Sequence, residues 1–133
     1  MTNLDGELAM ASGCEHTHTP FMLSSWSTTP LEDVAKAAPN SLKLFQIYLS
    51  KIPEVNKDLW KRVKDAGYVA LGLTTDTQLL GKRENDIRNN FQLPEGMHMA
   101  NYQAYNKTFG QNADIKSSGK DSGLAEYVRN HKD

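Results

Sequence analysis

The sequence contains one cysteine, no excess of either charge and no long apolar run. A single cysteine, Cys14, excludes an internal disulfide and favours a reducing, intracellular compartment. Fifteen basic and sixteen acidic side chains leave a net charge of -1, without the positive excess that binding to a nucleic-acid backbone requires. No apolar stretch approaches the roughly 20 residues that cross a bilayer, and the polar start does not resemble a signal peptide. These absences predict an intracellular protein that binds neither nucleic acid nor a membrane.

The chain is also short. With 133 residues, of which 38% are hydrophobic, it can bury one modest core. Nothing in this length requires a second domain. We therefore expect residues 1–133 to form one domain or part of one.

Short apolar runs alternate with helix signals, which predicts an α/β fold. We expect strands at 21–25, 42–49 and 68–73, and helices at about 4–16, 29–38 and 53–66. The unbroken run 68–73 is typical of a parallel strand that is covered on both faces. Strands joined by helices define right-handed βαβ units and a parallel sheet. A barrel is preferred to a doubly wound sheet, because no Gly-rich dinucleotide turn follows a strand.

Two of these helices have signals at their ends. Thr29, Pro30 and Glu32 predict a capping box, in which Thr29 caps the helix and Glu32 bonds back to the cap. The next helix is expected to open at Pro53 and to end at Gly67. Its apolar positions form one stripe, which consists of Val55, Leu59, Val63 and Ala66.

The pattern weakens in the last part of the chain. A polar stretch from Asp76 to Asn90 is compatible with a helix. Residues 93–122 form a long region without periodicity, which is typical of an active-site lid or a mobile excursion. Residues 122–129 predict the start of another helix.

Each of the three predicted strands ends in hydrogen-bonding side chains. Ser24 ends the first strand, Gln46 and Tyr48 end the second, and Thr74 follows the third. In a parallel barrel the active site lies at the carboxyl ends of the strands. Gln46 and Tyr48 are two residues apart and therefore point to the same side. We expect a candidate site at this end, although a strand end can also be polar simply because it meets water.

Three segments at these positions resemble the FMN-dependent 2-hydroxy-acid oxidases, the glycolate oxidase and lactate oxidase family. They are Met22–Ser27, Phe45–Tyr48 and Leu73–Arg83, and the stretches 84–94 and 121–125 are also similar. The match covers nearly the whole chain in one register. It implies a partial (β/α)8 TIM barrel with about three parallel strands, connecting helices and a long βα loop at 93–122.

The resemblance also implies roles for five residues. Ser24, Gln46 and Thr74 would bind the FMN ring, because neutral donors and acceptors match the edge of an isoalloxazine. Tyr48 would contact the hydroxyl or carboxylate of the substrate and act in catalysis. Arg83 would grip the substrate carboxylate with its planar guanidinium. The plainer alternatives are a packing aromatic at the rim for Tyr48 and a solvated helix charge for Arg83.

Other parts of the family pattern are missing. A complete barrel needs about 250 residues, and the resemblance implies that the histidine base, its neighbouring arginine and the phosphate-binding loops lie outside this chain. His16 and His18 lack a third metal ligand, so no metal site is expected. We therefore expect an inactive fragment of an oxidase that converts small 2-hydroxy acids to 2-oxo acids.

Alternatives to this function remain open at the level of sequence. One is a non-catalytic remnant or interaction fragment of the same fold, and a weaker one is a flavin-dependent isomerase of the same superfamily. For the complete oxidase the resemblance implies a homo-oligomer, a tetramer, in the peroxisome or the cytoplasm.

Overall fold

Three parallel strands form the main sheet of the computed structural model, which describes residues 3–50, 52–76, 82–105, 117–118 and 121–122. The strands are β1 (Phe21–Ser24), β2 (Lys43–Ile47) and β3 (Ala70–Leu73), and they lie in the order β1-β2-β3. The helices before and between them are α1 (Gly6–His16), α2 (Leu31–Ala37) and α3 (Pro53–Asp65). The predicted α/β fold with parallel βα units is confirmed.

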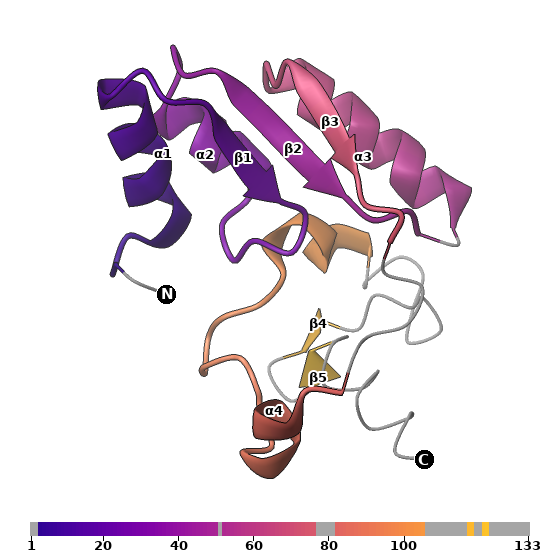
Figure 1. Ribbon diagram of the computed structural model, residues 1–133. Helices are drawn as coiled ribbons and strands as arrows, with labels where there is room; N and C mark the ends of the chain where they lie inside the picture. The colour runs from indigo at the N-terminus through magenta and orange to yellow at the C-terminus, as the bar shows by residue number, and fades with distance from the viewer. Residues whose placement is uncertain (1–2, 51, 77–81, 106–116, 119–120, 123–133) are drawn as a thin grey trace.

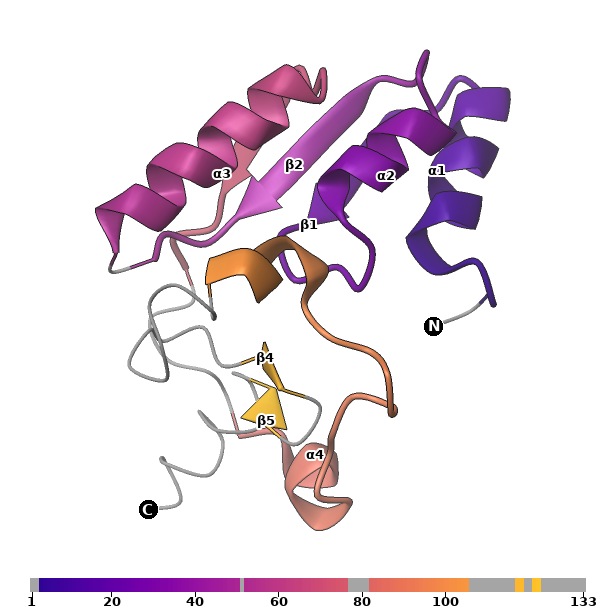
Figure 2. The same ribbon diagram turned by 180° about the vertical axis from the view of Figure 1, so that it is seen from behind.

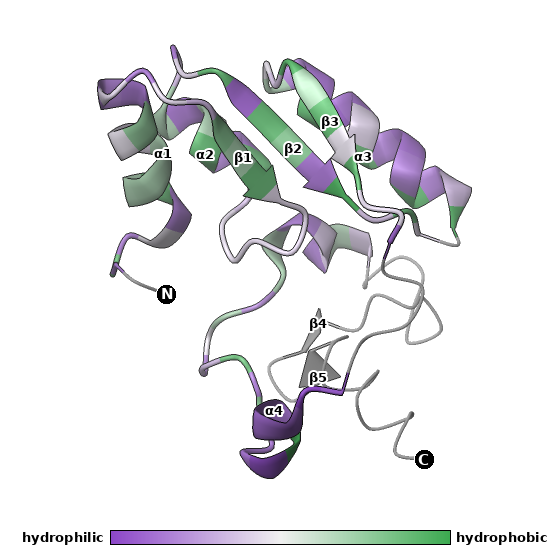
Figure 3. Ribbon diagram, in the orientation of Figure 1, coloured by the Kyte–Doolittle hydropathy of each residue, from purple (hydrophilic) through white to green (hydrophobic). Residues whose placement is uncertain are grey.

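The helices lie on one side of the sheet. α2 and α3 cover one face, and α1 packs beside α2 next to β1 (Figures 1 and 2). The strands carry mostly hydrophobic residues, whereas the short helix α4 (Glu84–Arg88) is largely hydrophilic (Figure 3). α4 is set apart from the sheet, beyond the carboxyl ends of the strands (Figure 1). None of the helices in the described part of the chain is long and apolar enough to span a bilayer.

Three further elements are short. η1 is a 3₁₀ turn at Ala100–Tyr102, and β4 (Ser117–Ser118) pairs with β5 (Asp121–Ser122) in an antiparallel ladder. The helix predicted at 122–129 lies outside the described residues, apart from its first position.

The core lies between the sheet and its helices. Alternate strand residues point toward the helices because side chains alternate across a strand. Leu23, Phe45 and Ile47 are buried in this way. The apolar positions of α2 and α3 meet them, and the buried ones are Leu31, Val34, Val55, Leu59 and Val63. The predicted apolar stripe of the third helix is thus confirmed, with Ala66 only partly buried.

The prediction that strand 68–73 is covered on both faces is wrong for this structure. Val69 is 63% exposed, and Leu71 and Leu73 are 46% and 50% exposed. β3 is the edge strand of the sheet, so only β2 flanks it among the described residues. The unbroken apolar run therefore identified a strand suited to burial, but not the neighbours that would bury it.

The predicted capping box is also wrong. Thr29 Oγ1 donates to Glu7 Oε2 at 2.7 Å, and Glu32 Oε1 accepts from Arg62 Nε at 2.7 Å. The free amide of Leu31 at the start of α2 donates instead to Asn101 Oδ1 at 2.9 Å. Partners from distant parts of the chain thus replace the local cap. The predicted end of α3 is confirmed, because Gly67 follows its last turn with a left-handed φ of 81°.

Residues 99–105 of the predicted long loop are packed into the core, so the mobile alternative is wrong for them, whereas the active-site-lid alternative stays a prediction. Met99, Tyr102 and Tyr105 belong to the buried hydrophobic cluster, and Asn101 is fully buried. Arg62 of α3 holds this segment by donating to Asn101 O at 2.9 Å and to the Tyr105 hydroxyl at 3.2 Å. The segment is held by side-chain contacts with α2 and α3, which leave no periodic signature in the sequence.

Glu7 on α1 offers a test of these tertiary contacts. Its carboxylate accepts from the amide of Thr28 at 2.9 Å and from the hydroxyls of Thr28 and Thr29. Burial alone would raise the pKa of Glu7, but these hydrogen bonds outweigh it and hold the pKa below the ordinary 4.5. The ionised carboxylate therefore stabilises the fold above pH 4.5, and this contribution is lost as the pH falls through the lower, folded-state pKa.

We predict that Glu7→Gln lowers the free energy of unfolding at neutral pH by about 1 kcal/mol, a value reduced for the partial exposure of the carboxylate. The difference from the unmodified chain should shrink in acid, because the parent carboxylate is then protonated. Urea unfolding at neutral and acidic pH measures both effects. A difference that stays constant across this range would show that the ionised carboxylate is not its cause.

Candidate functional site

Ser24, Gln46 and Thr74 form one chain of hydrogen bonds across the carboxyl ends of the three strands. The Ser24 hydroxyl donates to Gln46 Oε1 at 3.4 Å, and Gln46 Nε2 donates to Thr74 Oγ1 at 2.8 Å. The strand register causes this alignment, since Ser24 lies opposite Gln46, and Gln46 opposite Gly72. The structure thus brings together the three residues that were predicted to bind a flavin.

Tyr48 follows β2 and lies against Trp26, which belongs to the loop after β1. The two ring centroids are 4.9 Å apart, and the ring planes are inclined by 35°. The backbone amide of Trp26 donates to Ser24 Oγ at 3.1 Å, which links the two aromatic rings to the hydrogen-bond chain. Sequence analysis did not single out Trp26, and its only signal was its place two residues after Ser24.

Tyr102 is a second residue that sequence analysis missed. It is 4% exposed, and it comes from η1, far along the chain from the strands. Burial raises the pKa of the Tyr102 phenol and outweighs the lowering effect of Ser25, and the nearby Tyr48 phenol raises the pKa further. Tyr102 therefore stays neutral and lies near Tyr48. No local pattern in the sequence could have placed it there.

Arg83 is not joined to these residues by any contact among those described. It precedes α4, its Nε lies 2.6 Å from Asp86 Oδ2, and its side chain is 48% exposed. A guanidinium has five N–H donors, so this ion pair leaves others available for a ligand. The role of Arg83 as a carboxylate clamp stays a prediction.

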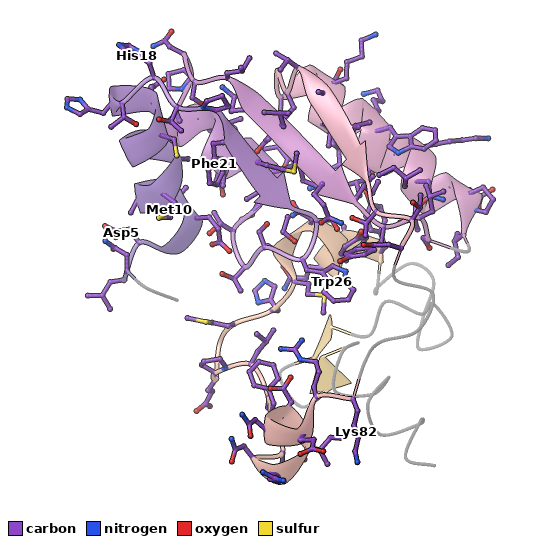
Figure 4. All side chains as sticks on the ribbon, in the orientation of Figure 1. Asp5, Met10, His18, Phe21, Trp26 and Lys82 are labelled. Carbon is purple, nitrogen blue, oxygen red and sulfur yellow. The ribbon has the colours of Figure 1, made fainter. Side chains whose placement is uncertain are left out.

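The histidines near the start of the chain lie far from this site. Figure 4 shows His18 and Trp26 at opposite ends of the sheet. His18 therefore cannot act on a ligand bound at the carboxyl ends of the strands. Within the described part of the chain, no three His, Cys, Asp or Glu side chains are grouped closely enough to hold a metal ion.

Comparison with known proteins explains this arrangement. The family model of the FMN-dependent dehydrogenases matches residues 1–133. The chain belongs to the FMN-dependent dehydrogenase family. Its similar relatives include 2-Hydroxyacid oxidase 1 of Mus musculus and Glycolate oxidase 3 of Arabidopsis thaliana, each 41% identical over 128 residues. The alignments cover 96% of this chain but only 34% and 33% of those proteins. The chain therefore spans about a third of the length of the curated relatives that it matches.

Solved structures of a mandelate oxidase and an (S)-mandelate dehydrogenase show the same architecture. Mandelate oxidase in complex with (S)-4-hydroxymandelic acid is 30% identical and matches with a TM-score of 0.73 over 95% of this chain and 33% of its own. A chimera of (S)-mandelate dehydrogenase is 31% identical and has a TM-score of 0.70 over 76% of this chain. These neighbours are TIM barrels, so the three strands correspond to a part of such a barrel.

The polar atoms at the strand ends suit the edge of a flavin, the cofactor of FMN-dependent dehydrogenases. Gln46 Nε2 uses one proton on Thr74, which leaves Gln46 with one N–H and Thr74 with its O–H to donate. The ring atoms N1, O2 and N5 of a flavin are acceptors. Gly72 has no side chain between these groups, and a Cβ at this position would come within 3.4 Å of Met22 Cε. The donor set favours the polar edge of a flat ring.

We predict that Gln46→Leu changes the free energy of unfolding by less than about 1 kcal/mol, because its hydrogen bonds are only partly buried. Phe45→Ala, on the helix side of the same strand, should cost about 3–5 kcal/mol because it opens a cavity in the core. Urea unfolding of both variants measures the contrast. Equal losses would mean that Gln46 has a structural role rather than a ligand-binding one.

Proposed function

We propose that this chain is part of an FMN-dependent oxidase that converts a small 2-hydroxy acid, such as glycolate or lactate, to the 2-oxo acid. The observation that carries the proposal is the continuous hydrogen-bond chain from Ser24 through Gln46 to Thr74, in which Gln46 and Thr74 each keep a donor that no described residue accepts from. The family and the names of the relatives support the reaction class.

The residues on this face would bind and orient the ring of the cofactor. Thr74 and Gln46 would donate their remaining protons to flavin acceptors, and Ser24 fixes the amide of Gln46 from the other side. Because these groups are neutral, they stabilise added electron density without binding a proton themselves. FMN, when bound, supplies the acceptor for the two electrons that leave the substrate carbon.

Two further residues would act on the substrate. The Tyr48 phenol would donate a hydrogen bond to the substrate oxygen at which charge develops, and Trp26 would form an apolar wall beside it. Arg83 would pair with the substrate carboxylate, which keeps its charge throughout the reaction. Removal of the substrate proton requires a base, which this proposal places outside the chain.

The chain alone is therefore expected to be inactive and marginally stable. On the open face and edge of the sheet, about half of the surface of Met22, Leu71 and Leu73 is exposed, so apolar area remains in water. The competing function is a non-catalytic remnant or interaction fragment, which would show no saturable flavin binding. For the complete oxidase we propose a homo-oligomer, with peroxisomal or cytoplasmic localisation.

We predict that the chain binds FMN weakly, with a dissociation constant above the micromolar range, and turns over neither glycolate nor lactate. Riboflavin should bind as well as FMN, because the proposed contacts reach only the ring and not the phosphate. Quenching of flavin fluorescence measures both affinities. Sub-micromolar binding of FMN, or a strong preference for FMN over riboflavin, would contradict the proposed ring-only contacts.

The matched control for this titration is Gln46→Leu, which removes the central amide and, as predicted above, keeps the fold. It should abolish saturable binding of both flavins. If it binds them as the parent does, the hydrogen-bond chain is not a flavin site. If the folded parent binds neither flavin, the remnant function is favoured.

A further prediction concerns the substrate side, in a chain extended by the remaining strands of a family relative. Arg83→Met should raise KM for short 2-hydroxy acids by about one to two orders of magnitude, equivalent to about 1.5–3 kcal/mol, with a smaller fall in kcat. The physical reason is that the carboxylate binds equally in the ground and transition states. Steady-state kinetics give both constants.

Tyr48→Phe is the comparison for this variant. It keeps the ring and deletes the hydroxyl that would stabilise developing charge, so its effect should fall mainly on kcat. An unchanged KM in Arg83→Met would identify this arginine as a solvated charge. If Tyr48→Phe changed only the thermal stability and left kcat and KM unchanged, that tyrosine would be a packing residue.

A further inference from the structure

The loop between β1 and α2, residues 25–30, carries the aromatic wall of the site. Trp26 is in this loop, and its ring lies 4.9 Å from that of Tyr48. Trp26 is 39% exposed, so more than half of its surface is covered, and the contact with Tyr48 is the ring contact on this side. The backbone of the loop sets where the indole starts, and so contributes to its position.

Asn101 binds this loop on both sides of Trp26. Its Nδ2 donates to Ser25 O at 3.3 Å and to Ser27 Oγ at 2.9 Å. Its Oδ1 accepts from the amide of Leu31 at 2.9 Å, at the end of the loop. One amide side chain thus holds the residue before Trp26, the residue after it and the start of the next helix.

Asn101 is itself fixed in place. It is fully buried, and its backbone carbonyl oxygen accepts a hydrogen bond from Arg62 at 2.9 Å. Arg62 in turn forms a bidentate ion pair with Glu32 through Nε and Nη2. Burial would lower the pKa of Arg62, but its bonds to Glu32 and Tyr105 outweigh this effect and raise the pKa. The guanidinium therefore stays charged and anchors the segment that carries Asn101.

We propose that Asn101 is a positioning residue, which holds the indole of Trp26 against the ring of Tyr48 through its two amide donors. Its side-chain hydrogen bonds go to the loop and to the start of α2, so it acts through the loop. As a role in catalysis this inference rests on the proposed function. The placement of Trp26 is a property of the folded chain alone, and it can be measured without flavin or substrate.

The experiment uses the full chain with Trp60→Phe, which leaves Trp26 as the single tryptophan of the two in the sequence. Near-UV circular dichroism reports aromatic rings held in fixed packing. The difference between this parent and its Tyr48→Leu variant defines the band that depends on the Trp26–Tyr48 contact. Asn101→Ala should lose most of this band and keep the far-UV signal of the helices.

Leu59→Ala is the matched control, because it removes a buried side chain of α3 and destabilises the core without touching the loop. It should keep the band, measured where the variant is still folded. A band retained in folded Asn101→Ala overturns the proposal. A band lost equally in Leu59→Ala also overturns it, because the contact would then follow general stability. If the folded parent itself lacks the band, the proposal is also overturned, because Trp26 and Tyr48 would then have no fixed contact.

Asn101→Asp decides the matter if Asn101→Ala does not fold. When ionised, the introduced carboxylate keeps an acceptor for the amide of Leu31 and has no donor for Ser25 and Ser27. The band is therefore followed with rising pH, because a protonated carboxyl could donate in place of the amide. Loss of the band in folded Asn101→Asp at high pH supports the proposal, and its retention there overturns it. Because no flavin is present, these results are independent of the flavin titration, so failure of the positioning role is distinguishable from failure of the proposed function.

Discussion

A buried amide joins segments of the chain that are far apart in sequence. Asn101 bonds to Ser25, Ser27 and Leu31, which precede it by 76, 74 and 70 residues. Each of these polar groups is buried, and leaving one without a partner would destabilise the folded chain. The loop after β1, the start of α2 and the segment around η1 therefore depend on one another. The candidate site lies where they meet.

The two faces of the sheet have different tasks. The helix side carries the core, with Phe45 and Ile47 almost completely buried. The other face carries Ser24, Gln46 and Thr74, and no helix among the described residues covers it (Figure 1). Because side chains alternate along a strand, substitutions at neighbouring positions of β2 act on different properties. Core packing and the proposed flavin contacts can thus be altered separately within one strand of five residues.

The parts of the fold that follow from local patterns could be predicted from the sequence. Apolar runs gave the three strands, the stripe from Val55 to Val63 gave α3, and Gly67 marked its end. The register of parallel strands then aligned Ser24, Gln46 and Thr74, as the polar strand ends had indicated. These features involve residues that are close in sequence or related by strand geometry, so periodicity and spacing are sufficient to find them.

The remaining features depend on contacts between distant residues. Thr29 and Glu32 match a capping box in sequence, but Glu7 and Arg62 offer them charged partners, which bind more strongly than a backbone amide. Tyr102 and Asn101 lie in the short 3₁₀ turn η1, which is too brief to leave a periodic pattern and is held by contacts with distant residues. The same long-range contacts that obscure the local signals place Trp26 beside Tyr48.

The distribution of charge around the site follows from this arrangement. Ionised groups such as Glu7, Glu32 and Arg62 hold the loop from the side of the helices, where each has an opposite charge or several hydrogen bonds. The side chains at the strand ends are neutral. A neutral set of donors orients a ring without fixing its protonation state, because none of these groups exchanges a proton near neutral pH. In the proposed oxidase, these strand-end side chains would therefore contribute geometry, and the base for proton removal would be another residue.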